Sequence, residues 1–373
     1  MRSCLSGITM AKSSGPPSLE PVGEDVPSDL GDGWPVAAAS QVGLDAAVLH
    51  EIGPRFESWK EASAHAVVVV RRGVLVYERY FPGDDWHWNQ HLTGVAFDAT
   101  VRHDIRSITK SITSLLVGVA RARGSIGSLD TPVVAFFPEY ADLCTPEWER
   151  ITLAHLLTMS SGLSWQERVS WDNPANDERA MDEAADPYRY VLQRPVETLP
   201  GRYFQYCGGA PTLLQGIIQN TSNSALDVLA KEALFEPLGI QDVEWIRFRN
   251  GDPKGFGGLR LRARDLAKIG QLVLDRGRWQ GKQIIPSEWI AESTEAHING
   301  EGILFYGYQW WLGRALHQRR EFRWIAGLGN GGQRLYILPE LEVVIAVFSG
   351  AYSVTQIVGE TILKHYVLPA VMA

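Results

Sequence analysis

A serine and a lysine separated by one helical turn occur in the stretch IRSITKSITSLLVGVARARG, residues 105–124. Apolar residues recur there at helical spacing, which predicts a buried helix: Ile108, Ile112, Leu115, Leu116 and Val119. Ser107 lies at the start of this helix, and Lys110 lies one turn later on the same face. A serine hydroxyl becomes a nucleophile when a base removes its proton. A lysine can be that base, because burial lowers the pKa of an amine from its usual value of about 10.4.

A purely structural interpretation of the same pair remains open at this point. Ser107 is also a favourable helix N-cap. Lys110 can equally be a surface lysine whose aliphatic stem covers apolar neighbours. Because S-x-x-K arises often by chance, the pair alone does not decide between a catalytic and a structural role.

A second candidate motif lies in WIAGLGNGGQRLYILP, residues 324–339, where Gly327, Gly329 and Gly332 spell G-x-G-x-x-G. A dinucleotide-binding unit requires a helix directly after these glycines and an acidic residue about 20 positions later. Here the glycines lead into QRLYILP, which alternates like a strand, and the later stretch GAYSV contains no acid. The sequence therefore favours a strand edge over a nucleotide-binding loop.

Other site signatures are absent from the sequence. There is no G-x-S-x-G nucleophile elbow and no H-E-x-x-H zinc motif, and the nine histidines are scattered. The three cysteines have no C-x-x-C spacing, and Cys207 is interpreted as a small packing residue. We therefore expect no metal and no cofactor.

The overall charge and hydropathy exclude several classes of partner. The net charge is −8 and no basic block occurs, so nucleic acid is not expected as a partner. No apolar run approaches eighteen residues, and the first residues lack a continuous apolar segment, so we expect a cytoplasmic protein without a membrane span. The oligomeric state is left open.

Strand-like segments lie at both ends of the chain, with a helical, loop-rich stretch between them. HAVVVVRRGVLVYERYF, residues 65–81, predicts a hairpin broken at residues 71–73, and YGYQWWLG, RLYILP and EVVIAVFSG predict strands near the C-terminus. This order predicts an α+β fold, with an antiparallel sheet flanked by helices and an inserted, mainly helical lobe. The cleft between the lobes is the default place for a site.

The expected boundaries follow from this layout. Residues 1–40 are rich in Ser, Pro, Gly and acids, and predict a disordered or extended arm. Residues 41–373 form a single domain. Its α/β lobe spans about 41–105 plus 255–373, and its helical lobe spans about 106–254.

Further motifs carry a family resemblance. After S-I-T-K, the stretches LPGRYFQYCGGAPTLLQGII (199–218), GGLRLRARDLAKIGQLVLDRGRWQGKQIIPSEWI (257–290) and YGYQWWL (306–312) follow in order. With them, the chain from about 64 to 365 resembles the serine β-lactamase and penicillin-binding-protein superfamily. Within it, the chain is similar to the class C β-lactamase-like hydrolases, which include family VIII carboxylesterases and 6-aminohexanoate-dimer hydrolases. The resemblance implies a β-lactamase/transpeptidase-like fold.

The resemblance also implies roles for individual residues. Ser107 would be the acylated nucleophile, and Lys110 its base or proton relay. Tyr206, in Y-C-G, would pass a proton to the leaving group. Gly208 stands where the family has an asparagine or serine that contacts the substrate amide.

The third motif of the family, Lys-Thr-Gly, falls on Gly327-Leu328-Gly329 and lacks its lysine. This departure favours esterase or amidase activity over efficient β-lactam hydrolysis. The oxyanion donors would be the backbone amides of Ser107 and Asn330, and Gly327, Leu328 and Gly329 would line the substrate. Glycines there would permit close approach of the backbone to a substrate.

We therefore predict a serine hydrolase that cleaves an ester or amide bond of a small acyl substrate through an acyl-enzyme, with carboxylesterase activity first. Amide or 6-aminohexanoate-oligomer hydrolysis and weak β-lactamase activity are alternatives, as is an inactive ligand-binding module. The acidic segment at residues 171–190 is either a solvated loop or a cleft rim that influences substrate choice.

Overall fold

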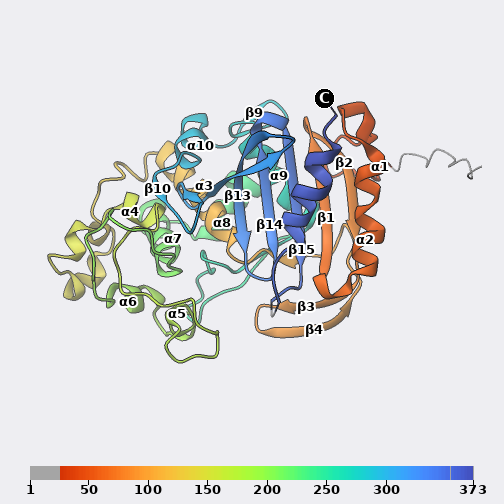
Figure 1. The fold of residues 1–373 in the computed structure, drawn as a ribbon. Coiled ribbons are helices and arrows are strands. Elements are labelled where there is room, and N and C mark those ends of the chain that lie inside the picture. The colour runs from red at the N-terminus through yellow and green to blue at the C-terminus, as the bar shows by residue number, and fades with distance from the viewer. Residues whose placement is uncertain (1–25, 353, 373) are drawn as a thin grey trace, which may run out of the picture.

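An eight-stranded antiparallel sheet forms the centre of the computed structural model, which describes residues 26–352 and 354–372 (Figure 1). Its strands follow the order β10 (Ile298–Asn299), β11 (Phe305–Tyr306), β12 (Trp311–His317), β13 (Arg320–Gly329), β14 (Gln333–Leu338), β15 (Val343–Ser349), β1 (Ala64–Arg71) and β2 (Val74–Tyr80). The N-terminal hairpin joins the C-terminal strands where Val67 pairs with Val347. The sheet is therefore assembled from both ends of the chain, as the sequence predicts.

The hairpin of β1 and β2 has the predicted turn. Arg72 and Gly73 both have positive φ, 52° and 74°, the backbone conformation of a tight turn that matches the twist of the strands. Every residue of β1 is buried, because helices cover both faces of the sheet. This explains why its sequence is a continuous apolar run rather than an alternating one.

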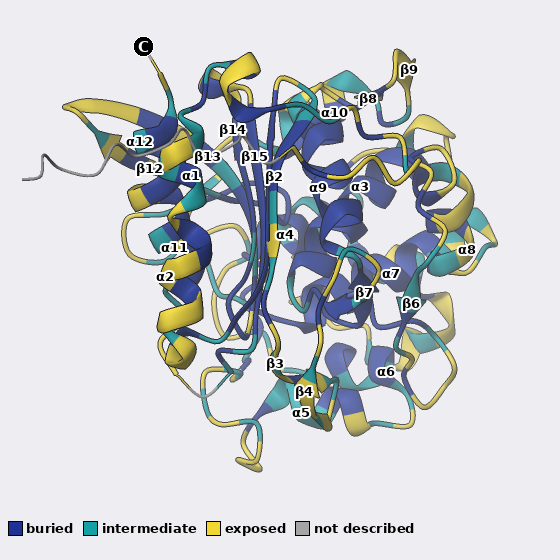
Figure 2. Cartoon of the chain, turned by 90° about the vertical axis from the view of Figure 1, so that its right-hand side faces the viewer, coloured by how far each residue is buried: buried dark blue, intermediate teal, exposed yellow. Residues whose placement is uncertain are grey.

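Helices cover the two faces of the sheet in separate layers (Figure 2). One layer contains α9 (Ala263–Leu274) and α3 (Ile108–Ala122), with α10 (Ser287–Ser293) beside α3. The opposite layer contains the terminal helices: α1 (Ala46–His50), α2 (Ile52–Ser58), α11 (Val358–Thr361), the π-helical turn η8 (Ile362–Val367) and α12 (Leu368–Ala370). Gly270 lets α9 approach the sheet closely, since a Cβ there would lie 2.4 Å from Val344 Cγ1.

A mainly helical lobe lies against α3 at one side of the sheet (Figure 1). Its helices are α4 (Leu153–Leu157), α5 (Asp177–Glu183), α6 (Pro187–Leu192), α7 (Gly209–Ser222), α8 (Leu226–Ala230) and the π-helical turn η6 (Lys231–Phe235). Helix α7 packs on α3, α4 and α6, and its residues from Gly209 to Ile218 are buried. The lobe therefore shares one apolar core with the sheet.

Short elements connect these layers. The strands are β3 (Gly83–His87), β4 (Gln90–Val95), β5 (His103–Asp104), β6 (Glu244–Trp245), β7 (Leu259–Leu261), β8 (Arg278–Trp279) and β9 (Lys282–Gln283). The 3-10 turns are η1 (Ala39–Val42), η2 (Lys60–Ala62), η3 (Val133–Phe136), η4 (Pro138–Leu143), η5 (Trp148–Arg150) and η7 (Pro339–Leu341). Strand β5 pairs with β7 and leads directly into α3.

The segment expected to be an arm divides into two parts. Residues 1–25 lie outside the described residues. The part from Val26 to Ser40 packs on the fold: the Trp34 ring is buried and its Nε1 donates to the Arg264 carbonyl at 3.1 Å, and Val36 bridges Leu75. Among the described residues, no helix has the length and apolar character needed to cross a membrane.

Candidate active site

Ser107 and Lys110 contact each other directly at the start of α3. Lys110 Nζ lies 2.9 Å from Ser107 Oγ and 2.8 Å from the Phe256 carbonyl oxygen, to which it donates a hydrogen bond. The lysine side chain is only 1% exposed, so it is not the surface lysine of the structural interpretation. Ser107 occupies the N-cap position of α3, but its hydroxyl is engaged by Lys110 rather than by a helix amide. Ser107 itself remains partly exposed.

The backbone before the serine is held in an unusual conformation. Arg106 has a positive φ of 49°, which costs energy in a residue other than glycine and persists only where neighbours enforce it. Its guanidinium pairs with Asp104 at 3.1 Å, donates to the Trp88 carbonyl at 2.9 Å and lies over the Tyr352 ring. These contacts turn the chain sharply from β5 into α3 and thereby present Ser107 at the helix N-terminus.

Tyr206 lies beside the Ser107–Lys110 pair. Lys110 Nζ is 5.0 Å from the centre of the Tyr206 ring, which stacks on Trp311 at 5.7 Å. Burial, followed by the charge of Glu167, holds the pKa of Tyr206 well above its usual value, although a hydrogen bond with Ser107 acts in the other direction. The tyrosine hydroxyl therefore stays protonated at neutral pH.

The glycine-rich end of β13 lies against the start of α3. A Cβ at Gly327 would lie 2.8 Å from Ile108 Cγ2, and one at Gly329 would lie 2.5 Å from the Ile105 carbonyl oxygen. The register between β12 and β13 ends at Trp311 and Ala326, so β12 does not extend along residues 327–329 in the described part of the chain. This stretch is a strand edge beside the start of α3.

Asn330 lies one residue beyond this strand, in the turn between β13 and β14. It is exposed, and its side-chain oxygen accepts hydrogen bonds from the Gly331 amide at 2.9 Å and from Gln356 at 2.7 Å. The strand β14 follows the glycines, which agrees with the rejection of a nucleotide-binding helix at this point.

Two glutamates that sequence reasoning did not single out approach the same site. Glu178, in α5, places Oε2 4.0 Å from Lys110 Nζ, and its side chain is 20% exposed. Glu167 accepts hydrogen bonds from the Gly208 amide and from Trp165 Nε1, both at 2.6 Å. Glu167 and Glu178 are hydrogen-bonded to each other. We call these two residues the acid pair.

The acid pair shares a proton. Burial, and then the charge of Glu167, raise the pKa of Glu178 to about 8. Burial also raises the pKa of Glu167, against the opposing charge of Lys110. The Glu178 carboxyl group is therefore protonated at neutral pH and donates its proton to Glu167.

Gly208 makes room for the acid pair. A Cβ at this position would lie 2.6 Å from Glu178 Oε2, closer than any real contact. The Glu178 carboxyl group thus occupies the space that a side chain at the third position of Y-C-G would fill, and a glycine stands there. The segment 171–190 supplies this carboxyl group, and so reaches the centre of the site rather than forming only a solvated loop.

Cys207 next to Tyr206 is buried, and burial raises the pKa of its thiol well above the usual value. It is therefore a packing residue, as interpreted from the sequence, and not a reactive thiolate.

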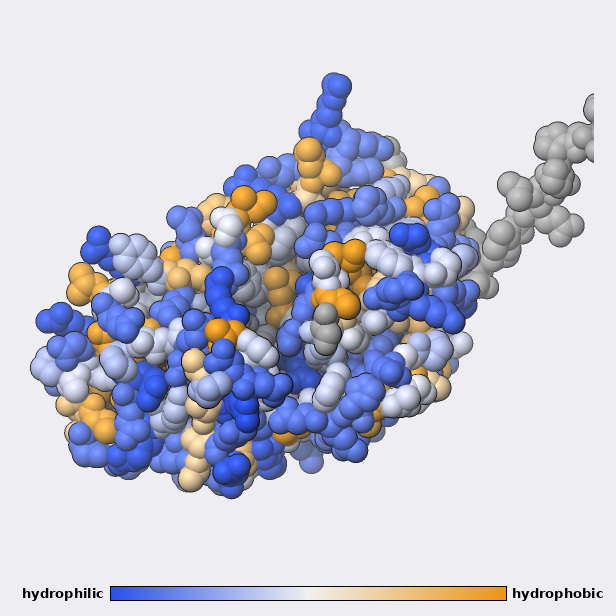
Figure 3. Space-filling view, turned by 60° about the horizontal axis from the view of Figure 1, so that its bottom comes forward, coloured by the Kyte–Doolittle hydropathy of each residue, from blue (hydrophilic) through white to orange (hydrophobic). Residues whose placement is uncertain are grey.

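The surface is hollowed between the helical lobe and the sheet. Figure 3 shows this hollow from the side that comes forward from the bottom of Figure 1.

Comparison with protein families gives one match that covers most of the chain. The family model described as Beta-lactamase matches residues 58–353. The 6-aminohexanoate-dimer hydrolase of Paenarthrobacter ureafaciens is 24% identical over 357 residues, which cover 86% of this chain and 83% of that protein.

Solved structures share the fold. The octameric penicillin-binding protein homologue from Pyrococcus abyssi superposes with a TM-score of 0.63 at 21% identity, covering 86% of this chain and 77% of that one. EstCE1, described as a hydrolase with promiscuous acyltransferase activity, gives a TM-score of 0.65 at 15% identity and covers 84% of this chain and 96% of its own.

Proposed function

The chain belongs to the beta-lactamase family, and from this premise we propose that it is a serine hydrolase that acylates Ser107 with a small ester or amide substrate. The observation that carries the proposal is the contact of 2.9 Å between the buried Lys110 amine and the Ser107 hydroxyl. Carboxylesterase activity is the first choice, because the stretch 327–329 offers no cation for a substrate carboxylate.

The proposed reaction begins with proton transfer from Ser107 Oγ to Lys110 Nζ as Oγ attacks the acyl carbon. The negative charge that develops on the substrate oxygen is met by the Ser107 amide at the start of α3 and by an amide from residues 327–330 of the facing strand edge. Asn330 is the donor that the sequence names, and the close approach of Gly327 to Ile108 in α3 and of Gly329 to the Ile105 carbonyl supports this proposal.

Tyr206 completes the first half of the reaction. Its hydroxyl, kept protonated by burial, passes a proton to the leaving alcohol or amine and is reprotonated through Lys110. Water then attacks the acyl-enzyme and gives up a proton to Lys110 or Tyr206, and these two groups return that proton to Ser107 Oγ as its bond to the acyl carbon breaks. The net result is one ester or amide bond and one water converted to an acid and an alcohol or amine.

Amide hydrolysis is the second candidate, because the 24% identical relative that aligns over most of the chain is named as a 6-aminohexanoate-dimer hydrolase. A panel of short p-nitrophenyl esters, linear amides and a cephalosporin distinguishes the three substrate classes by their kcat/KM values.

The direct test of the proposal is Ser107→Ala. This variant should lose turnover of p-nitrophenyl butyrate, and the wild-type chain should be labelled by a fluorophosphonate on the tryptic peptide that contains Ser107. Full turnover by Ser107→Ala, or a label on a different residue, would show that the serine is not the nucleophile. A folded chain that binds ligands but takes up no label would favour the inactive binding module.

A further inference from the structure

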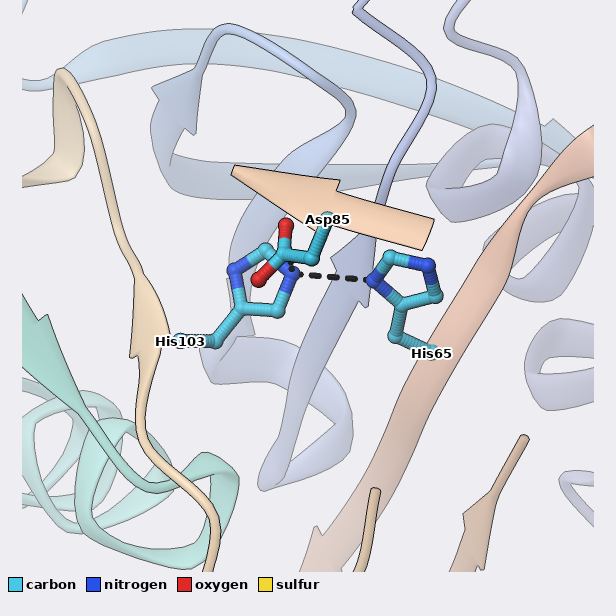
Figure 4. Close-up of side chains that lie close together, drawn as sticks. All are labelled: His65, Asp85 and His103. Atoms are coloured by element: carbon cyan, nitrogen blue, oxygen red, sulfur yellow. Dashed lines mark hydrogen bonds and ion pairs between the residues drawn. The ribbon is translucent and has the colours of Figure 1, made fainter. Parts of the chain in front are cut away.

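Two histidines and an aspartate from three separate strands converge in the interior (Figure 4). His65 lies in β1, Asp85 in β3 and His103 in β5, and all three side chains are buried. His65 Nδ1 is 3.0 Å from His103 Nε2, which is 3.1 Å from Asp85 Oδ1. One donor atom from each of the three residues lies within 4.8 Å of the other two. We call this group the His–Asp–His cluster.

His103 Nε2 and the Asp85 carboxylate repel each other unless a positive charge lies between them. His103 Nδ1 donates to the Asp104 carbonyl oxygen at 2.9 Å, so in the neutral ring Nε2 carries a lone pair. That lone pair faces a carboxylate oxygen and a second imidazole nitrogen at contact distance. Within the described residues, Asp85 Oδ1 has no hydrogen-bond donor of good geometry. A cation, either an extra proton on His103 or a metal ion, is needed to stabilise the arrangement.

We propose that His65 Nδ1, His103 Nε2 and Asp85 Oδ1 bind a divalent transition-metal ion of the Zn²⁺ type. Imidazole and carboxylate ligands suit such ions, and three protein ligands plus one water complete a tetrahedron. With metal–ligand bonds of about 2.0–2.1 Å, neighbouring ligand atoms of a tetrahedron are about 3.3 Å apart, close to the 3.0 and 3.1 Å found here. The hydrogen bond from His103 Nδ1 to a backbone carbonyl is the usual orientation of a metal-bound histidine.

A surface pocket lies close to the His65 ring, on the side away from the other two residues of the cluster. A pocket of about 790 Å³ is lined by Gly83, Asp84 and Gly350, among others. Cβ atoms at Gly83 and Gly350 would lie 2.7 and 2.9 Å from His65 Nε2, so the absence of side chains at these two positions leaves only backbone between the imidazole and the pocket. An ion would have to pass this backbone and the His65 ring to reach Nδ1.

The bound ion would join three strands that belong to three different sheets of the described chain. It would link β1 of the central sheet, β3 of the outer hairpin and β5, which ends three residues before Ser107. Asp104, directly after His103, pairs with Arg106 at 3.1 Å, so the ion would also restrain the backbone that presents the nucleophile. His65, Asp85 and His103 are positioning residues in this proposal, which concerns the stability of the fold and does not depend on the proposed hydrolase activity.

The test measures metal content and thermal stability of the full chain. Protein produced in medium supplemented with Zn²⁺ should contain one metal ion per chain, and chain refolded from denaturant with Co²⁺ should show the visible absorption of tetrahedral Co²⁺. Asp85→Asn, which preserves shape, and His103→Gln should both lose this ion. The matched control is His365→Gln, an exposed histidine in η8 that should retain it. Chelation during refolding should lower the Tm of the wild type and of the control, and leave the Tm of Asp85→Asn unchanged.

Two results would overturn the proposal. One is wild-type protein without a stoichiometric ion after both treatments, with a Tm that does not respond to the chelator. In that case a proton on His103, paired with Asp85, neutralises the cluster. The other is full metal content in both Asp85→Asn and His103→Gln, which would place the ion elsewhere. If His103→Gln fails to fold, Asp85→Asn and the wild type still decide the question.

Discussion

Glu178→Gln is expected to change the pH dependence of catalysis without removing the reacting groups. Below pH 8 Glu178 is protonated and donates to Glu167, and a glutamine amide donates in the same way. Above pH 8 the wild-type acid pair gains a negative charge on Glu178 that the variant cannot gain. This charge arises 4.0 Å from Lys110 Nζ. At that distance one charge is worth about 4 kcal/mol with an effective dielectric constant of about 20.

The charge on Glu178 lies beside the proton that passes from Ser107 to Lys110 in the proposed reaction, so it alters the rate at pH values where Glu178 is ionised. The kcat/KM of the wild type should therefore level off or fall above pH 8, while that of Glu178→Gln continues to rise. At one to two pH units above pH 8, the kcat/KM of the variant should exceed that of the wild type on the order of tenfold or more. Near pH 6.5 the two kcat/KM values should be similar. The assay is kcat/KM for a p-nitrophenyl ester with a leaving-group correction across this range.

Thermal unfolding gives a second test, because the raised pKa of Glu178 fixes the direction in which stability changes with pH. Between about pH 4.5 and pH 8 the folded chain keeps a proton on Glu178 that the unfolded chain releases, so wild-type stability declines as the pH rises through this window. The full shift corresponds to on the order of 5 kcal/mol at most. The Tm of Glu178→Gln relative to wild type should therefore rise from pH 5 to pH 8.

The matched control is Glu183→Gln, in the same helix, where the carboxylate is exposed and pairs with Arg179 at 2.9 Å. It should leave both the kinetic profile and the Tm difference nearly unchanged. The reasoning is refuted if Glu178→Gln and the wild type have the same alkaline limb, or if their Tm difference does not vary with pH.

The remaining predictions concern the reacting groups and the strand beside them. Lys110→Met should fold, as circular dichroism would show, but lose about 10²–10⁴ in the acylation rate measured by stopped flow; an unfolded variant would favour a structural lysine. Tyr206→Phe should lose far more turnover on alkyl esters than on p-nitrophenyl esters, whose leaving group needs no proton, and equal losses would contradict its role. Gly327→Val should push the strand from Ile108 and cost about 10²–10³ in kcat, whereas Gly127→Ala, with open space around its Cα, should cost nothing.

The parts of the site that the sequence predicted are those encoded over short distances. Ser107 and Lys110 lie within one turn of one helix, so their contact follows from the spacing alone once burial is granted. The hairpin at residues 71–73 and the strand after the glycines follow from similarly local patterns. Tyr206 came from the family resemblance, because nothing in its own surroundings relates it to a serine almost a hundred positions earlier.

The acid pair was missed because its contacts are formed between distant segments. Glu178 lies in an acidic, turn-rich stretch that is also typical of a solvated loop, and only the absence of a side chain at Gly208 hints that something else fills this space. The His–Asp–His cluster was missed for the same reason. Scattered histidines carry no motif spacing, and the pairing of β1 with β15 and of β5 with β7 is what brings His65 and His103 together.

Contacts restrain the two sides of the active site to very different degrees. This difference determines which positions can be mutated to change the substrate range. On one side, the chain from His103 to Ser107 is fixed by buried ion pairs, a strained turn and two strands, so nearly every replacement there disturbs the nucleophile. On the other side, Gly208 and the acid pair belong to loops and one short helix. Mutational libraries confined to residues 168–175, none of which is buried, should therefore yield new substrate ranges at little cost to folding, whereas libraries in the run before Ser107 should yield mainly inactive chains.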